Sequence, residues 1–396
     1  MKILLGLTGL GLDGGISSVS RSIARVVELE RLRGAVDSVH HVLLEDESPP
    51  PESASPGSSY FLAGGSKSRF FVGMWLAILR FQPQLILFDH VGLGRALLPS
   101  LPLRRPPYDV FVHGLELIGA SRDIRGKVLR AARRVHANSA FTAERLLNQM
   151  PELESRVNVV PLCVEPHRIE QWSATTKGNL ELSSNTLIRE SMAPESEVSR
   201  AREKAALIVG RMWSEQPGKG HDALIEGWPQ VVSRIEGAEL WIAGGGDDVL
   251  RLENLAREFG VEQYVKFLGR ISDEELARRY LSASVFVMPS SQEGFGLVYL
   301  EAMWHGLPCI GSTADAAPCV IDATCGLLVP YGDASATATA IADLISDSER
   351  CEKLGAAGRR KVETEFSFEH FHSRFAESIG ISRWSGPSSR GDQSRE

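Results

Sequence analysis

Two glutamates, Glu293 and Glu301, stand on either side of a glycine turn within residues 288–306. An apolar run at 283–287 precedes the turn and predicts a buried strand, and a short helix that Gly306 can end is predicted to follow it. A strand, a glycine turn and a helix are how α/β proteins offer backbone N–H groups to a phosphate. This stretch therefore predicts an anion site.

Glu301 falls on the apolar face of that helix, because at about 100° per residue it lies roughly 40° from Leu297, with Trp304 and Leu300 on the other side of Leu297. A buried carboxylate is costly unless a partner hydrogen-bonds to it. One interpretation is a salt bridge to an Arg or Lys elsewhere in the chain. The other is a ligand that carries hydroxyl groups beside phosphates, which describes a nucleotide with its ribose.

Two histidines, His90 and His113, follow the short apolar runs 85–88 and 109–112. Such runs are typical of parallel strands, and open α/β sheets bind ligands at the carboxyl ends of their strands. His113 is the better candidate because Gly114 lets a substrate approach the backbone. From the residues alone, a purely structural His113 is an equally good interpretation.

A glycine-rich turn at 9–15 follows the predicted strand 2–8. No well-placed acidic residue stands about 20 positions further on, so the turn is not a dinucleotide fingerprint. The backbone N–H groups of Gly14 and Gly15 are nevertheless available to an anion.

The elements that must position these residues form two series of alternating strands and helices. The strands of the first series are expected at 2–8, 39–44, 85–88, 109–112, 135–139 and 157–161, and those of the second at 206–209, 239–243, 265–269, 285–287 and 309–310. A chain of 396 residues with 43% hydrophobic and 23% charged content suits two soluble domains. The fold class is α/β with two doubly wound domains. Their expected limits are a first domain at 1–165, a linker or excursion at 166–204, a second domain at 205–370, and a C-terminal helix that can pack back on the first domain, followed by a disordered tail, at 371–396.

Three other segments carry expectations. Residues 45–68 are rich in Pro, Ser and Gly and predict a mobile surface loop. The helix at 69–80 is apolar and flanked by cations, so it suits a membrane surface, although an ordinary core-facing helix is the favoured interpretation. The basic residues between Arg122 and Arg134 are interpreted as one helix with a solvated face, and Ser139 is expected to cap the helix that follows.

The cysteine content and the absence of a long apolar run predict a cytoplasmic protein. The five cysteines show neither C-x-x-C pairing nor zinc spacing, and no apolar run reaches the roughly 18–20 residues of a membrane span. Residues 1–165 carry a net charge of +3, which leaves −10 for the rest of the chain. This asymmetry permits peripheral contact with an anionic partner or with the inner face of the membrane.

Taken in order, several motifs resemble those of the family 4 (group 1) retaining glycosyltransferases, which have the GT-B fold of two Rossmann-like domains facing each other across a cleft. The motifs are Gly14-Gly15-Ile16, His113-Gly114, Val209-Gly210-Arg211 with Lys219-Gly220, Ile242 to Gly246, Phe267 to Arg270, the pair Glu293 and Glu301, and Gly326 to Pro330.

The resemblance implies a role for each charged residue. Arg211 and Lys219 are expected to clamp the diphosphate of a nucleoside-diphosphate sugar and stabilise it as a leaving group. Glu293 is expected to hold hydroxyls of the transferred sugar, and Glu301 those of the ribose. His113 is expected to contact the sugar from the first domain.

Backbone contacts are implied as well. The turn Gly294, Phe295, Gly296, Leu297 and Val298 is expected to bind the phosphates, Gly14 and Gly15 to lie beside the diphosphate, and Arg270 with Ile271 to line the base pocket.

The implied reaction transfers the sugar to an acceptor hydroxyl of a sugar, glycolipid or polysaccharide, with retention and by a front-face route. No cofactor, no metal ion and no nucleic-acid partner are expected, since the chain has no Asp-x-Asp motif and Arg211 and Lys219 supply positive charge. An epimerase or phosphorylase on the same fold, or a non-catalytic nucleotide-sugar-binding protein, are the alternatives. One departure is Pro161-Leu-Cys-Val-Glu165, where the family often has Pro-Asn-Gly-Val-Asp, and it leaves the contacts of this hinge open.

Overall fold

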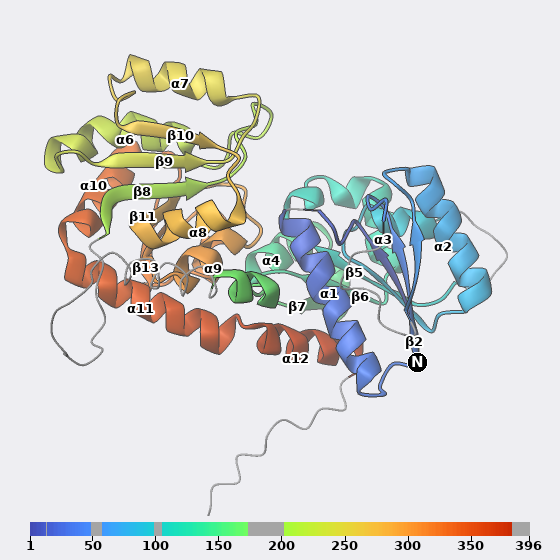
Figure 1. Ribbon diagram of the computed structural model, residues 1–396. Coiled ribbons are helices and arrows are strands. Elements are labelled where there is room, and N and C mark those ends of the chain that lie inside the picture. Colours follow the sequence, from blue (N-terminus) through green and yellow to red (C-terminus); the bar gives the residue numbers. More distant parts are fainter. Residues whose placement is uncertain (13, 49–57, 99–104, 173–201, 382–396) are drawn as a thin grey trace, which may run out of the picture.

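The computed structural model describes residues 1–12, 14–48, 58–98, 105–172 and 202–381, which form two α/β domains (Figure 1). In the described part of the first domain, one parallel sheet has the order β3-β2-β1-β4-β5-β6-β7. Its strands are β1 (Lys2–Leu7), β2 (Ser38–Leu43), β3 (Ser58–Leu62), β4 (Leu85–Phe88), β5 (Tyr108–Val112), β6 (Arg134–Ala137) and β7 (Val157–Val159). Its principal helices are α1 (Gly15–Leu32), α2 (Lys67–Phe81), α3 (Ile124–Ala131) and α4 (Ala140–Gln149).

The second domain repeats this plan with a parallel sheet of order β10-β9-β8-β11-β12-β13. Its strands are β8 (Glu203–Val209), β9 (Glu239–Ala243), β10 (Val265–Gly269), β11 (Ala283–Met288), β12 (Cys309–Ser312) and β13 (Gly326–Val329). Its helices are α6 (His221–Arg234), α7 (Val249–Glu258), α8 (Asp273–Ser282), α9 (Leu297–Trp304), α10 (Ala334–Ser346) and α11 (Ser348–Glu365).

The strand order reverses direction between β1 and β4 in one sheet and between β8 and β11 in the other. Such reversals leave a crevice at the carboxyl ends of the strands, where α/β proteins bind ligands. The glycine-rich turn follows β1, Arg211 follows β8, and the turn with Glu293 follows β11. The topology thus brings the predicted site residues to these two crevices.

One apolar cluster runs through both domains. It joins buried residues of α1 and β1 to the sheet of the second domain by way of Leu162, Cys163, Val164 and Trp172. In the segment that leaves the first domain, residues 162–165 and Trp172 are therefore buried, and residues 166–172 are helical.

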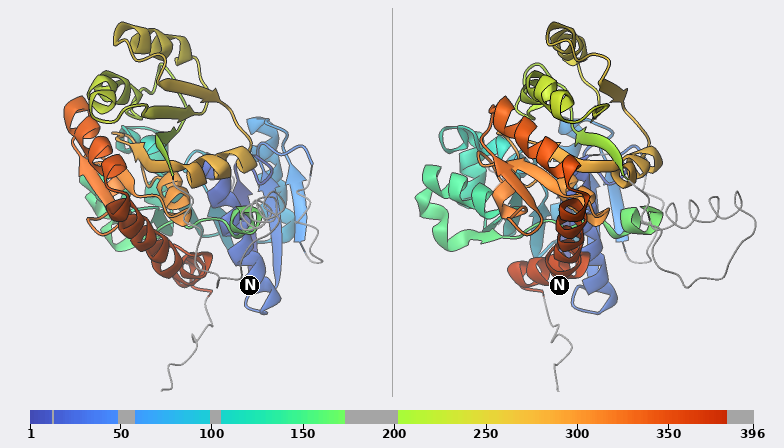
Figure 2. Two further views of the ribbon diagram at one scale, coloured as in Figure 1. Left: turned by 60° about the vertical axis from the view of Figure 1, so that its left-hand side comes forward. Right: turned by 90° about the vertical axis from the view of Figure 1, so that its left-hand side faces the viewer.

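The chain returns to the first domain at its carboxyl end, where α12 (Phe368–Ile379) packs beside α1 (Figure 2). The aromatic ring of Phe375 lies 6.0 Å from that of Phe111 on β5 and 5.4 Å from that of His136 on β6. Arg133 donates to the carbonyl of Ile379 at 3.0 Å and to the buried carboxylate of Asp109. These contacts attach α12 to the first domain.

Two expectations about the first domain were wrong. The basic segment 122–134 is not one solvated helix, because α3 ends at Ala131 and Arg134 lies in β6, where it donates to the carbonyl of Ser378. Residues 45–68 are not all loop, because β3 pairs in parallel with β2 at the edge of the sheet. This strand is short and half-exposed and begins with Ser58 and Ser59, so its start resembles the Ser-rich segment before it. The rest of that predicted loop at 49–57, the excursion at 173–201 and the tail at 382–396 lie outside the described residues.

Helix α2 buries one apolar stripe that includes Phe70, Met74 and Ile78, as expected of a core-facing helix. It also exposes a second apolar stripe, with Val72 56%, Leu76 37% and Leu79 49% accessible. Among the described helices, none has the length and apolarity needed to cross a membrane.

We expect Phe375→Ala to lower the free energy of unfolding by about 3–5 kcal/mol, the range for truncating a buried Phe. Phe375 is 1% exposed at the junction of α12 with the first sheet. Urea denaturation measures the change, with Phe259→Ala as the control, since Phe259 on the surface of the second domain is 39% exposed. Equal losses for both variants would contradict the described packing of α12.

Candidate active site

The two domains touch through the backbone of the turn after β11. The carbonyl of Gly294 accepts hydrogen bonds from Ser139 Oγ at 2.6 Å and Thr142 Oγ1 at 3.1 Å, both in the first domain. A Cβ added to Gly294 would lie 1.5 Å from the carbonyl oxygen of His113. Only glycine fits here, and its close approach places Glu293, the neighbour of Gly294, beside the segment of the first domain that carries His113.

A buried aspartate, Asp315, fixes the same turn from the second domain. Its Oδ2 accepts from the backbone N–H of Glu293 at 3.1 Å and from the hydroxyl of Ser290, and its Oδ1 accepts from the N–H of Ala317 at 2.9 Å. Burial raises the pKa of Asp315 to about 6, against the opposing effect of these hydrogen bonds and of Lys219. The turn is therefore fixed by Asp315 of the second domain at the N–H of Glu293 and by the first domain at the carbonyl of Gly294.

The predicted diphosphate clamp lies beside this turn. Lys219 Nζ forms an ion pair with Glu293 Oε1, and the two side chains are 24% and 17% exposed. Burial, together with the nearby charge of Arg211, lowers the pKa of Lys219 to about 8. Arg211 itself is exposed and its guanidinium lies 4.0 Å from the ring centroid of Trp213. Lys219 and Glu293 thus form an ion pair, and Arg211 faces solvent beside them.

The two glycines on either side of Lys219, Gly218 and Gly220, pack against the loop that carries Glu293 and thereby fix the position of Lys219. A Cβ on Gly220, which has φ +89°, would lie 2.6 Å from the carbonyl oxygen of Pro289, and the N–H of Ser291 donates to the carbonyl of Gly218 at 2.9 Å. The loop that carries Lys219 therefore lies directly on the loop that carries Glu293.

Glu301 is buried, as the helical wheel predicts, and both of its oxygens have partners. Arg168 Nη1 lies 2.5 Å from Oε1, and Tyr280 OH donates to Oε2 at 3.1 Å. Burial raises the pKa of Glu301, while Arg168 and Tyr280 act in the opposite direction. Of the two interpretations drawn from the sequence, the salt bridge is therefore present, and the carboxylate also adjoins the predicted phosphate turn.

His113 is oriented by its surroundings. Its Nε2 lies 2.6 Å from the carbonyl oxygen of Asp89, its backbone N–H donates to Glu116, and its ring stacks on that of His90 at 6.2 Å. A carbonyl oxygen can only accept, so Nε2 donates this hydrogen bond, which selects the tautomer in which Nδ1 holds the lone pair. His113 is thus prepared to accept a hydrogen bond from a hydroxyl.

The glycine-rich turn of the first domain reaches the start of α9. A Cβ on Gly15 would lie 3.9 Å from Leu297 Cδ1, so this predicted pair does meet across the cleft. The carboxylate of Asp46 accepts from the N–H groups of Leu10 at 2.9 Å and Gly11 at 2.8 Å. Asp46 comes soon after β2. Its position in the sequence could therefore have indicated that its side chain lies at the carboxyl edge of the sheet.

The remaining candidates lie around the same crevice. Gly296 starts α9 with φ 90°, and Gly14 starts α1 with φ 122°. Leu297 and Val298 are half-buried, while the ring of Phe295 packs on that of Phe366 at 5.9 Å and leaves only its backbone for a ligand. Arg270 is exposed and Ile271 half-buried, immediately before α8.

The sequence did not reveal the residues that act by holding others, namely Arg21, Asp46, Thr142, Arg168 and Asp315. Ser139 was identified as a helix cap, and it does accept from the N–H of Thr142 at 3.0 Å, but its bond to Gly294 was not foreseen. Within the described ranges, no group of three His, Cys, Asp or Glu side chains is placed to hold a metal ion.

Comparisons with known proteins fall mainly on the second domain. Residues 203–347 match the family model described as glycosyl transferases group 1. A GDP-mannose-dependent monoacylated alpha-(1-6)-phosphatidylinositol monomannoside mannosyltransferase of Corynebacterium glutamicum is 38% identical over 160 residues, 39% of this chain and 42% of the relative. A GDP-mannose-dependent alpha-(1-6)-phosphatidylinositol monomannoside mannosyltransferase of Mycobacterium tuberculosis is 34% identical over 169 residues, 41% and 44% of the two chains. The matches thus span less than half the length of these curated relatives.

Solved structures match over both domains. Sucrose-phosphate synthase from Thermosynechococcus elongatus superposes with a TM-score of 0.70 at 22% identity, covering 96% of this chain and 98% of its own. The Anabaena protein HepE, in complex with UDP, gives 0.70 at 18% identity, with coverage of 96% and 99%. At these identities the likeness concerns the fold, and it confirms the GT-B architecture of two facing Rossmann-like domains.

We expect Gly294→Ala to separate the two domains, because its Cβ would collide with the carbonyl of His113 and displace the bonds from Ser139 and Thr142. Small-angle scattering should show a larger radius of gyration than in the wild type. The matched control is Gly245→Ala, whose Cβ meets nothing nearer than 3.5 Å. An unchanged radius for Gly294→Ala would show that the contact does not hold the cleft closed.

Proposed function

We propose that this chain is a retaining glycosyltransferase that moves a mannosyl group from GDP-mannose to a hydroxyl of a glycolipid or polysaccharide acceptor, a proposal supported by the match of residues 203–347 to the model of group 1 glycosyl transferases. The observation that carries the proposal is the pair of Lys219 and Glu293, held in the cleft opposite His113 with Arg211 nearby. The names of the curated relatives support GDP-mannose as the donor.

In this proposal each charged group has one task. Arg211 and Lys219 neutralise the diphosphate as the bond between it and the anomeric carbon breaks. Glu293 and Nδ1 of His113 accept hydrogen bonds from hydroxyls of the sugar and fix it beside the acceptor. The acceptor oxygen bonds to the anomeric carbon on the face that the diphosphate leaves, and the acceptor proton passes to a departing phosphate oxygen.

No cofactor or divalent metal ion takes part in the proposed chemistry, since the two cations supply the charge. The two-carboxylate arrangement of glycosidases is not used, because Glu301 is assigned to the ribose. The protein is proposed to work in the cytoplasm.

The test is incubation with GDP-mannose that carries a label in the sugar, together with lipid and polysaccharide acceptors, with and without EDTA. We expect labelled acceptor, with the α-anomeric configuration retained and the rate unchanged by EDTA. Release of sugar phosphate only with added phosphate would identify a phosphorylase, isomerised donor an epimerase, and tight binding without turnover a binding protein. A thermal-shift comparison of GDP-, UDP- and ADP-sugars tests the donor base.

We expect Lys219→Ala to lower kcat at least roughly tenfold, because one of the cations that stabilise the leaving group is lost. Lys266→Ala is the control, since Lys266 is exposed on β10. Near-normal kinetics for Lys219→Ala, with an intact fold by circular dichroism, would contradict the assigned clamp.

The pH profile gives a separate test. The pKa of Lys219 is lowered to about 8, so its amine loses charge as pH rises through that value, and we expect kcat/KM to fall above about pH 8. In Lys219→Arg the cation persists, and the fall should move to higher pH. If the variant and the wild type decline at the same pH, another group controls the profile.

Peripheral membrane contact is proposed through α2. Its exposed stripe of Val72, Leu76 and Leu79 lies on a helix that also carries Arg69 and Arg80, a combination that suits an anionic lipid surface. We expect the wild type to co-sediment with phosphatidylglycerol vesicles and the triple change to Gln to abolish this. Leu250→Gln on α7 is the control, since Leu250 is 73% exposed on the second domain. Equal binding by the triple variant and the wild type would rule out α2.

A further inference from the structure

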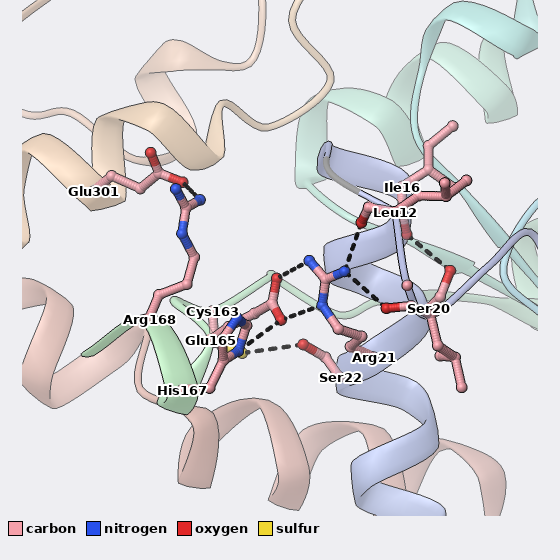
Figure 3. A network of polar contacts seen from close by, with 12 residues as sticks. Leu12, Ile16, Ser20, Arg21, Ser22, Cys163, Glu165, His167, Arg168 and Glu301 are labelled. Carbon is pink, nitrogen blue, oxygen red and sulfur yellow. Dashed lines mark hydrogen bonds and ion pairs between the residues drawn. The ribbon is translucent and has the colours of Figure 1, made fainter. Parts of the chain in front are cut away.

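Arg168 reaches from the linker between the domains to the subsite proposed for the nucleoside (Figure 3). Its Nη1 lies 2.5 Å from Glu301 Oε1, and its Nη2 lies 2.9 Å from Oδ1 of Asp273, the first residue of α8. Its guanidinium also lies over the ring of Trp172 at 5.1 Å. One linker side chain thus joins the ribose carboxylate to the segment that follows Arg270 and Ile271.

The linker is itself anchored to the first domain (Figure 3). The buried carboxylate of Glu165 accepts from Arg21 Nε at 2.6 Å and from Arg21 Nη2 at 2.8 Å, and these bonds help to lower the pKa of Glu165 to about 2 despite its burial. Arg21 also donates to the carbonyls of Leu10 and Leu12 in the glycine-rich turn. The backbone N–H of Arg168 in turn donates to the carbonyl of Glu165 at 3.1 Å. The position of Arg168 is therefore set by ion pairs at both ends of the linker.

Arg168 and Tyr280 do not use all the acceptor positions of the Glu301 carboxylate. A carboxylate has about four acceptor positions, and Arg168 and Tyr280 use one on each oxygen. Burial favours the neutral form of Glu301, and the guanidinium opposes that effect. Hydrogen bonds to an ionised acceptor are roughly twice as strong as those between neutral groups. A Glu301 that stays ionised and fixed is the better partner for the two hydroxyls of a ribose.

We propose that Arg168 is a positioning residue of the nucleoside subsite, which holds the carboxylate of Glu301 in one orientation for the ribose hydroxyls, so that the linker forms part of the donor site. The inference rests on the proposed function, because it takes Glu301 as the ribose-binding residue. The opposite role, in which Arg168 occupies the place of the ribose and must leave, predicts the reverse effect on affinity.

The test measures the affinity of GDP and 2′-deoxy-GDP by calorimetry for the wild type, Arg168→Met and Arg168→Lys. Loss of a hydrogen bond to a charged group lowers affinity about tenfold or more. We expect the wild type to bind GDP about tenfold more tightly than the deoxy form, and Arg168→Met to lose this preference while its affinity for 2′-deoxy-GDP changes less than twofold. Arg168→Lys should restore part of the preference. Arg234→Met is the matched control, since Arg234 also forms an ion pair in the second domain, with Asp343.

The outcomes separate the two proposals. An equal loss of affinity for both nucleotides in Arg168→Met, with Arg168→Lys unchanged in its preference, would mean that Arg168 is only structural. Tighter GDP binding by Arg168→Met would mean that Arg168 competes with the ribose, and either result overturns the inference alone. A wild type that does not bind GDP overturns the proposed function as well. Thermal denaturation of each variant shows that it is folded before its affinity is interpreted.

Discussion

The structure depends on the contact of two backbones, that of Gly294 with that of His113. The Gly294 carbonyl is bonded by Ser139 and Thr142, and its Cα leaves no space for a side chain. Backbone groups have fixed positions that long side chains do not have, so this contact sets the width of the cleft more closely than an ion pair could. This contact therefore sets how far the candidate residues beside Gly294 and beside His113 lie from the opposite domain.

The second constraint is charge that is kept away from water. Lys219 with Glu293, Arg168 with Glu301, and Arg21 with Glu165 are three pairs in which the carboxylate is mostly shielded. Removing one partner of such a pair leaves an uncompensated charge and costs several kcal/mol, so each pair must either persist or be replaced by a ligand of matching charge. In the proposed function an anionic diphosphate is such a ligand for Lys219, whereas the pair of Arg168 and Glu301 persists and the ribose hydroxyls donate to the remaining acceptor positions of Glu301. The site is therefore arranged electrostatically before any ligand binds.

The sequence was sufficient for the fold and for the candidates that carry a local pattern. Apolar runs marked the strands, and glycines beside them marked the turns at Gly15 and Gly294. The helical wheel showed that Glu301 is buried, but it could not show whether Arg168 lay opposite, because 133 positions separate the two. Strand β3 and the bonds of Asp315 were missed for the same physical reason, since pairing between distant segments leaves no periodicity in either of them.

Within the described residues the chain passes between the domains at residues 161–172 and again at the junction of α11 and α12. Trp172 already packs on His305 of the second domain, its ring 4.7 Å away, and Phe375 packs on the first. Two crossings restrict the relative motion of the domains more than one would, because both must bend together. We expect opening of the cleft to turn about these two crossings, so that the loops that carry Glu293 and His113 part and meet again together.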